Sequence, residues 1–242
     1  MGSSRAGRPT ARSRVNGSND RVPNVLIVPL AFVIAVAASV FSGCAVDARE
    51  TGYVQSLVEM RRENVVVQKF DLSCGAAVIA TVLNYQFGDS ITEREVATGL
   101  IQRKEYIENP ELVQLRQGFS LLDMKRYLST RGYIGTGYGN LEFADLVKMA
   151  PIIVAVSPIG YNHFVIFRGV IGDKVLLADP AFGNRTMSIE KFERIWIDFP
   201  ELGKVGFSVS RDGKQAPPGL LGVQPTQFVA PAPELVRNTL FR

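Results

Sequence analysis

The spacing of apolar and polar residues predicts helices in the first half of the folded body. Residues 74–87 (CGAAVIATVLNYQF) are apolar nearly all round and are followed by Gly88, so we expect a buried helix that ends there. Residues 105–118 contain Pro110 and Gly118 and are expected to form a loop. Further helices are expected where the sequence shows capping boxes or a short apolar period, over residues 54–60, 92–103, 120–132 and 141–149.

Beyond residue 150 the pattern changes to that of strands. Residues 152–156 (IIVAV) are typical of a strand buried on both faces. Residues 163–171 and 174–178 are expected to pair as a hairpin. A strand or extended chain is also expected over residues 64–67 and 133–140, a loop over 157–162 and a short helix over 188–196. Helices that come first and an antiparallel sheet that follows describe an α+β fold.

A long apolar segment precedes the body. Residues 25–41 carry no charge, and residues 1–23 before them contain five arginines and one aspartate, which is the pattern of an export signal. The end of the segment, Phe41-Ser42-Gly43-Cys44, resembles a bacterial lipoprotein box, in which Cys44 would be the lipidated first residue. Cleavage near Ala48 and retention as an uncleaved anchor are the alternatives. All three place the body in the cell envelope, on the periplasmic side of the membrane.

These patterns divide the chain into four parts. We expect an export signal or N-terminal membrane anchor over residues 1–43 and a linker over 44–60. Residues 61–205 form the functional domain in this interpretation. Residues 206–242 are expected to form a loosely packed tail, because prolines recur from residue 217 onward.

Charge and composition exclude several classes of function. The net charge of +4 lies wholly within residues 1–23, and the rest of the chain has 22 basic and 22 acidic side chains. The body therefore has no basic excess, and we do not expect a nucleic acid as its partner. With one histidine and two cysteines in the chain, no spacing suggests a metal site, and no cofactor is implied.

Four residues are candidates for chemistry. Cys74 is expected at a helix N-terminus, where the helix dipole stabilises a thiolate; a buried structural cysteine, or a disulfide with Cys44, is the alternative. His163 begins one strand of the expected hairpin, and Asp179 ends the other, so the carboxylate can orient the imidazole. Gln68 offers an amide that can stabilise an oxyanion. Taken singly, these three could equally be a core histidine, a turn residue and a solvated loop glutamine.

Together these stretches resemble one family. Gln68-Lys-Phe-Asp-Leu-Ser-Cys74-Gly-Ala-Ala resembles the Q-x5-C-G-x-A motif of the bacteriocin-processing, double-glycine leader cysteine peptidases. The stretch that begins at His163 resembles the His strand of that family, and the stretch from Lys174 to Asp179-Pro180 resembles its Asp strand. The segment from Ser188 to Trp196 resembles its closing helix and tryptophan. The resemblance covers about residues 60–200. One departure is Ser73, where many members have an acidic residue.

The resemblance implies a papain-like α+β fold and a cysteine peptidase that cuts after a Gly-Gly leader of an exported protein. Cys74 would be the nucleophile, His163 the general base and acid, Asp179 the orienting group and Gln68 the oxyanion donor. The chain has no G-x-x-x-x-G-K-[ST] loop, so it resembles stand-alone exported members, one of which occurs with functional-amyloid secretion systems. A non-catalytic module that binds a leader or partner, and acyl transfer to an amine, are the alternatives. From residue size, substrate contacts are expected at Tyr138, Tyr161 and Asn162.

Overall fold

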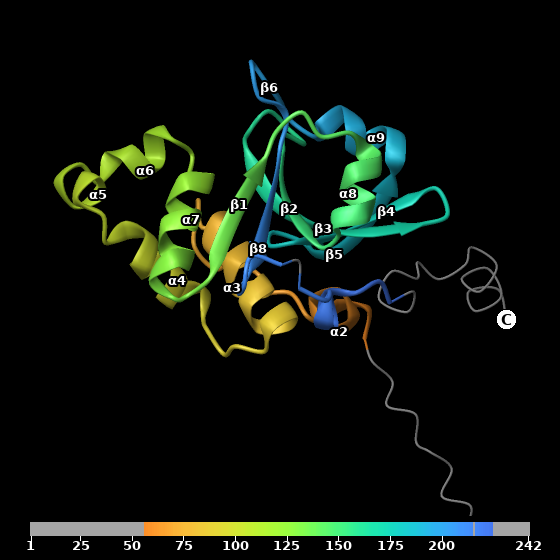
Figure 1. Ribbon diagram of the computed structural model, residues 1–242, viewed down its shortest axis with the longest axis horizontal. Coiled ribbons are helices and arrows are strands. Elements are labelled where there is room, and N and C mark those ends of the chain that lie inside the picture. Colours follow the sequence, from red (N-terminus) through yellow and green to blue (C-terminus); the bar gives the residue numbers. More distant parts are fainter. Residues whose placement is uncertain (1–55, 215, 225–242) are drawn as a thin grey trace, which may run out of the picture. The chain divides into compact units, whose positions relative to one another are not determined.

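The structure is a computed structural model that describes residues 56–214 and 216–224 (Figure 1). All of these residues belong to one compact unit, Val54–Arg242. The predicted export signal and Cys44 lie outside the described residues, as do most of the predicted linker and residues 225–242 of the predicted tail. Among the described residues, no helix is long and apolar enough to cross a membrane.

A six-stranded antiparallel sheet organises the domain. Its central strands are the hairpin of β3, His163–Ile171, and β4, Lys174–Asp179, flanked by β2, Ile152–Val156. The sheet order is β1-β8-β2-β3-β4-β5, in which the other strands are β1 (Ile134–Tyr138), β8 (Gly206–Ser210) and β5 (Gly183–Ser188). Two short strands, β6 (Asp198–Phe199) and β7 (Gly203–Lys204), form a separate hairpin.

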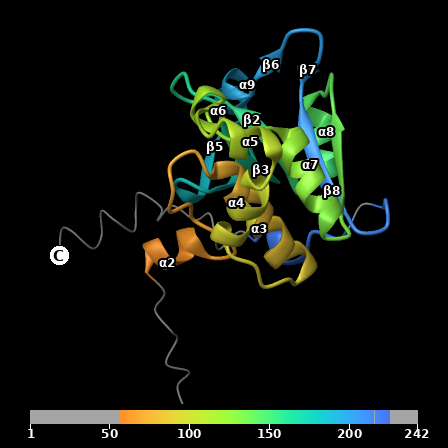
Figure 2. The same ribbon diagram turned by 90° about the vertical axis from the view of Figure 1, so that its left-hand side faces the viewer.

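Helices cover both faces of the sheet, because its strands are apolar on both sides. One face packs against the buried helix α3, Cys74–Phe87, through alternate residues such as Ile153 and Ile166. The other face packs against α8, Phe143–Met149, and α9, Ile189–Ile195. The remaining helices are α2 (Leu57–Arg62), α4 (Glu93–Ile101), α5 (Lys104–Glu108), α6 (Glu111–Leu115), α7 (Leu121–Thr130) and the 3₁₀ turn η1 (Gly219–Leu221). Figure 2 brings α4, α5, α6 and α7 to the front, with the sheet behind them.

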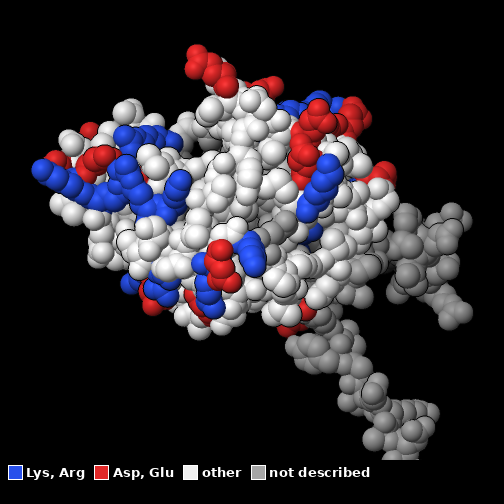
Figure 3. Space-filling view, in the orientation of Figure 1, with Lys and Arg blue, Asp and Glu red and all other residues white. Residues whose placement is uncertain are grey.

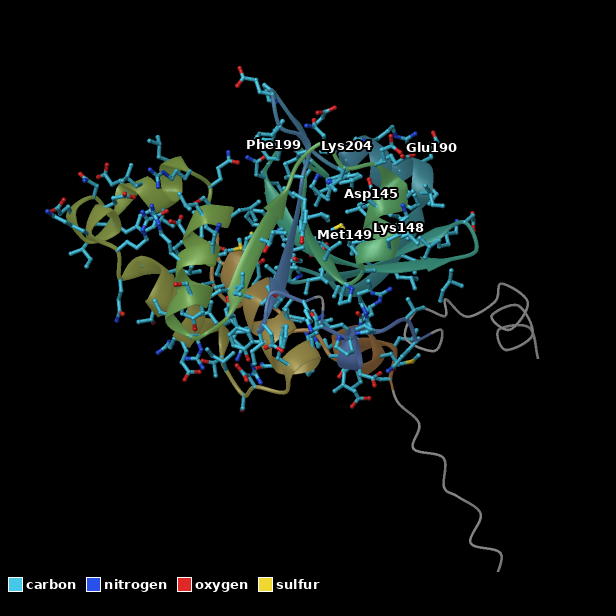
Figure 4. All side chains as sticks on the ribbon, viewed as in Figure 1. Asp145, Lys148, Met149, Glu190, Phe199 and Lys204 are labelled. Carbon is cyan, nitrogen blue, oxygen red and sulfur yellow. The ribbon has the colours of Figure 1, made fainter. Side chains whose placement is uncertain are left out.

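The outer surface carries both signs of charge. Positive and negative side chains both occur on the face shown in Figure 3. On α8, Lys148 and Asp145 lie 3.6 Å apart, and Lys204 lies 5.1 Å from the ring centroid of Trp196 (Figure 4). Exposed ion pairs of this kind contribute little to stability, so the two apolar layers hold the fold together.

The predicted α+β class and its principal elements are confirmed. The helix at 74–87 ends at Gly88, which has a left-handed φ of 79°. Ser120 and Thr92 both form complete capping boxes. The strand at 152–156 has the predicted bounds and is buried throughout.

Three predictions were wrong. Residues 105–118 contain α5 and α6 rather than a loop. Pro110 precedes α6 with a helical φ of −58° and ψ of −29°, and a proline is tolerated there because its missing N–H breaks no intrahelical hydrogen bond. Residues 206–210, which were assigned to the tail, form β8 inside the sheet. Residues 216–222 pack on the domain rather than loosely, because Leu221 is fully buried. The buried guanidinium of Arg168 donates hydrogen bonds to the main-chain oxygens of residues 220, 221 and 222.

Candidate active site

Cys74 is the first residue of α3 and is almost completely buried. The first turn of a helix offers main-chain N–H groups without intrahelical partners, and the helix dipole there favours a negative charge. A thiolate and an oxyanion are therefore both stabilised at this position. Cys74 is a free thiol.

A buried carboxylate shapes the loop that leads to Cys74. Glu93, the first residue of α4, is 4% exposed, and both of its oxygens accept the main-chain N–H of Lys69, at 3.0 and 2.9 Å. The hydroxyl of Ser73 donates to the same carboxylate and also lies 2.6 Å from the carbonyl oxygen of Phe70. Glu93 thus holds both ends of the segment 69–73. Ser73, the departure from the family motif, takes part in this network.

His163 and Asp179 lie side by side at the same end of the sheet. Nε2 of His163 is 2.8 Å from Oδ1 of Asp179, and both side chains are buried, at 3% and 0% exposed. The main-chain N–H of Ala181 donates to the same oxygen at 2.9 Å. Since Nε2 faces the carboxylate, Nδ1 is the ring nitrogen that remains for Cys74. The hairpin therefore brings the two residues together as their positions at its strand ends predicted.

The environment of His163 favours its charged form. Burial lowers the pKa of His163, but hydrogen bonds to Asp179 and Cys74, together with the charges of these two groups, raise it to about 9. At neutral pH the site accordingly holds an imidazolium between two acidic partners. Such an arrangement can activate a cysteine as a nucleophile and provide it with an acid-base partner.

Gln68 lies at the Asp179 end of the site, but its amide faces elsewhere. Its main-chain N–H donates to the carbonyl oxygen of Pro180 at 2.8 Å, which ties the segment to the residue after Asp179. Its Nε2 donates to the carbonyl oxygen of Phe70 at 3.3 Å, and its Oε1 is buried without a hydrogen-bond partner among the described residues. A half-turn of the amide would exchange these two atoms. The oxyanion role remains a prediction.

The three predicted substrate contacts lie at different places. The ring of Tyr161 is 5.9 Å from that of His163, in a T-shaped arrangement. The main-chain N–H of Asn162 donates to Oε1 of Gln117 at 3.3 Å. Tyr138 accepts a hydrogen bond from Ser208 and lies on β1, which β8 and β2 separate from the strand of His163. Tyr161 is thus beside His163, whereas Tyr138 belongs to the sheet edge.

Two charged residues at the site had no sequence signal. Glu93 is the first residue of α4, and in the sequence it looks like an ordinary acidic residue in the first turn of a helix. Arg185 lies on β5, an unpredicted strand, and its Nη2 is 2.9 Å from Oδ2 of Asp179. Only the pairing of β4 with β5 brings Arg185 to the carboxylate of Asp179.

Comparisons with known proteins identify relatives of the chain. A family model described as Peptidase C39 family matches residues 62–199, more than half of the chain. A protein named "Probable functional amyloid protease FapD" from Pseudomonas aeruginosa is 39% identical over 154 residues, which are 62% of this chain and 66% of the relative. The protein of the same name from Pseudomonas fluorescens is 38% identical over 153 residues, with the same two coverages. The chain thus spans slightly less than two thirds of the length of these relatives.

The fold also has counterparts among solved structures. One of them is a double glycine motif protease from an AMS/PCAT transporter in complex with the leader peptide, with 24% identity and a TM-score of 0.46, and the match covers 60% of this chain and 89% of the other. The family model covers Cys74, His163 and Asp179 together. From this match we conclude that the chain belongs to the Peptidase C39 family.

Proposed function

We propose that the protein is a cysteine peptidase that hydrolyses a peptide bond at the Cys74–His163–Asp179 site. The observation that carries this proposal is the buried His163, which is 2.8 Å from Asp179 and whose pKa is raised to about 9 by Asp179 and Cys74. A histidine buried for structural reasons alone would lose its proton more easily, because burial disfavours its charge. The site instead stabilises the imidazolium that an acid-base catalyst needs.

The reaction begins with attack by Cys74. Its sulfur forms a bond to the carbonyl carbon of the scissile peptide, and the carbonyl electron pair moves to the oxygen. Main-chain N–H groups of the first turn of α3 stabilise that oxyanion, assisted by Gln68 once its amide has turned. As the carbonyl re-forms, the C–N bond breaks and His163 gives its proton to the departing amine. A thioester on Cys74 and a neutral imidazole remain.

Water completes the cycle. Neutral His163 takes a proton from water, whose oxygen attacks the thioester carbon. The collapse of this second intermediate releases the carboxylic acid and returns the thiolate and imidazolium. Throughout the cycle Asp179 keeps the imidazole in one orientation through Nε2.

We propose further that the substrate is an exported protein carrying a Gly-Gly leader. The motif around Cys74 supports this, as does the name of the two Pseudomonas relatives, which are called functional amyloid proteases. We place the protein in the cell envelope, on the strength of the basic and apolar residues 1–43. Export would bring the domain to the same compartment as such a substrate. Lipidation of Cys44 or an uncleaved anchor would then hold it at the membrane.

The proposal is tested with two matched synthetic peptides. One carries Gly-Gly before the expected cut, and the other carries Val-Val in its place. We expect the wild-type domain to cleave after Gly-Gly, to spare Val-Val, and to lose cleavage on Cys74→Ala, as followed by mass spectrometry. Equal cleavage of both peptides would contradict the Gly-Gly preference. If wild type and Cys74→Ala bind the Gly-Gly peptide equally and neither forms a product, the domain is a non-catalytic binding module instead.

A further inference from the structure

Arg185 places a third charged group behind the catalytic pair. In the register of the sheet, Asp179 lies opposite Gly183, and Leu177 lies opposite Arg185. Residues two apart point to the same side of a strand, and Gly183 has no side chain there. The guanidinium of Arg185 can therefore reach back along β5 to the end of β4. Its Nη2 lies 2.9 Å from Oδ2 of Asp179.

Gly183 is required by this arrangement. Its φ is 80°, in the left-handed region, and a Cβ at this position would collide with the main-chain carbonyl of Arg61 in α2. The left-handed turn after β4 therefore requires glycine at this position, beside the pair that Arg185 forms with Asp179.

The guanidinium is largely shielded from water. The Arg185 side chain is 28% exposed, while Asp179 is fully buried. Its Nε and Nη2 are buried and form no hydrogen bond within the described part of the chain. Its Cζ lies 5.1 Å from the centre of the Phe182 ring. A cation in such a place is costly unless an opposite charge faces it, and Asp179 supplies that charge.

The two oxygens of Asp179 therefore face two different cationic groups, His163 and Arg185. Oδ1 accepts from His163 and from the N–H of Ala181, whereas Oδ2 faces Arg185. A positive charge beside Oδ2 opposes a second positive charge on the imidazole across the same carboxylate. Catalysis requires His163 to release its proton to the leaving amine, and a carboxylate without a second partner would retain that proton more strongly.

We propose that Arg185 is a positioning residue that neutralises the outer oxygen of Asp179 and so limits how tightly this carboxylate holds the proton of His163. The catalytic consequence rests on the proposed peptidase function, whereas the contact between Arg185 and Asp179 does not depend on a substrate. The groups that face His163 are Asp179 from β4, Cys74 from α3 and the ring of Tyr161 from the preceding loop. Arg185 faces Asp179 from β5.

The test compares Arg185→Met with Arg185→Lys, both in the Cys74→Ala protein. In that background Cys74 no longer raises the pKa of His163, so the titration falls at a lower pH and is easier to follow by NMR. We expect Arg185→Met to raise the pKa of His163 by about half to one pH unit, a three- to tenfold gain in proton affinity at a partly exposed pair. Arg185→Lys keeps the charge and is expected to stay near the parent value. Phe182→Ala, which removes only the ring, is the control for lost packing.

An unchanged or lowered pKa of His163 in Arg185→Met would overturn the proposal. If that variant does not fold, Arg185→Gln gives the same comparison. With Cys74 present, the alkaline limit of kcat/KM is expected to move upward in Arg185→Met, and kcat to fall several-fold with KM unchanged. If no peptide is cleaved by any variant, the proposed function fails, yet the NMR comparison still decides the role of Arg185.

Discussion

The single histidine of the chain makes the charge state of the site directly measurable. We predict that Asp179→Asn returns the pKa of His163 from about 9 to its ordinary value of 6.5 or below. Burial already lowers this pKa, and the hydrogen bond to Asp179 is the largest effect that raises it. Once the carboxylate is replaced by an amide, burial still lowers the pKa of His163, and only Cys74 remains to raise it.

The expected change is large. A pKa of about 9 leaves about 30 imidazolium ions for each neutral imidazole at pH 7.5, whereas a pKa of 6.5 leaves about one for every ten. The ratio changes about 300-fold, which corresponds to about 3 kcal/mol. Cys74→Ala removes a smaller contribution and is expected to lower the pKa less than Asp179→Asn does.

The assay is a proton NMR titration of the Hε1 resonance of His163. The protein must carry no histidine tag and must stay reduced, so that a single imidazole signal follows the pH. Circular dichroism at each pH checks that the fold persists. A wild-type midpoint at or below 6.5, or the same midpoint in wild type and Asp179→Asn, would refute the reasoning about this site.

Three further predictions concern the loop, the pH dependence of stability and the C-terminal segment. Glu93→Ala should lower kcat about tenfold or more by freeing the loop before Cys74, whereas Glu93→Gln keeps an acceptor and should retain more activity; equal losses would count against the hydrogen-bond role. Because the pKa of His163 is raised in the folded state, its stabilisation is complete below pH 6.5 and disappears as the pH rises through about 9. Urea unfolding should therefore show a loss of up to about 3 kcal/mol across this range in wild type and much less in Asp179→Asn, and a flat wild-type profile would contradict it. Leu221→Ala should cost about 2–3 kcal/mol in urea unfolding, since Leu221 is fully buried, and no loss would mean that residues 216–222 are not part of the core.

Local sequence signals were sufficient for the elements that carry Cys74, His163 and Asp179. The all-round apolar run of α3 and its terminal Gly88 determine a buried helix wherever it packs, so its bounds could be predicted. The hairpin of β3 and β4 is likewise a local structure, and it places His163 and Asp179 at one end without knowledge of the rest of the fold.

The missed features depend on contacts between distant segments. β8 is five residues long and pairs with β1 and β2, which precede it by more than fifty residues. Arg185 meets Asp179 only because β5 pairs with β4. Leu221 belongs to the core cluster, and Arg168 binds the main-chain oxygens of residues 220–222; no periodic pattern in the sequence indicates either contact. Gln68 was placed near the site, but the direction of its amide depends on the carbonyl of Phe70.

The reactivity of Cys74 tests the central claim most directly. Iodoacetamide labelling is followed by intact mass at several pH values in wild type and in His163→Ala, with peptide mapping to locate the label. Because His163 remains charged beside the thiol until about pH 9, we predict that at pH 6–7 wild-type Cys74 reacts at least about tenfold faster than in His163→Ala. Equal rates in the two proteins across this range would contradict a Cys74–His163 catalytic pair.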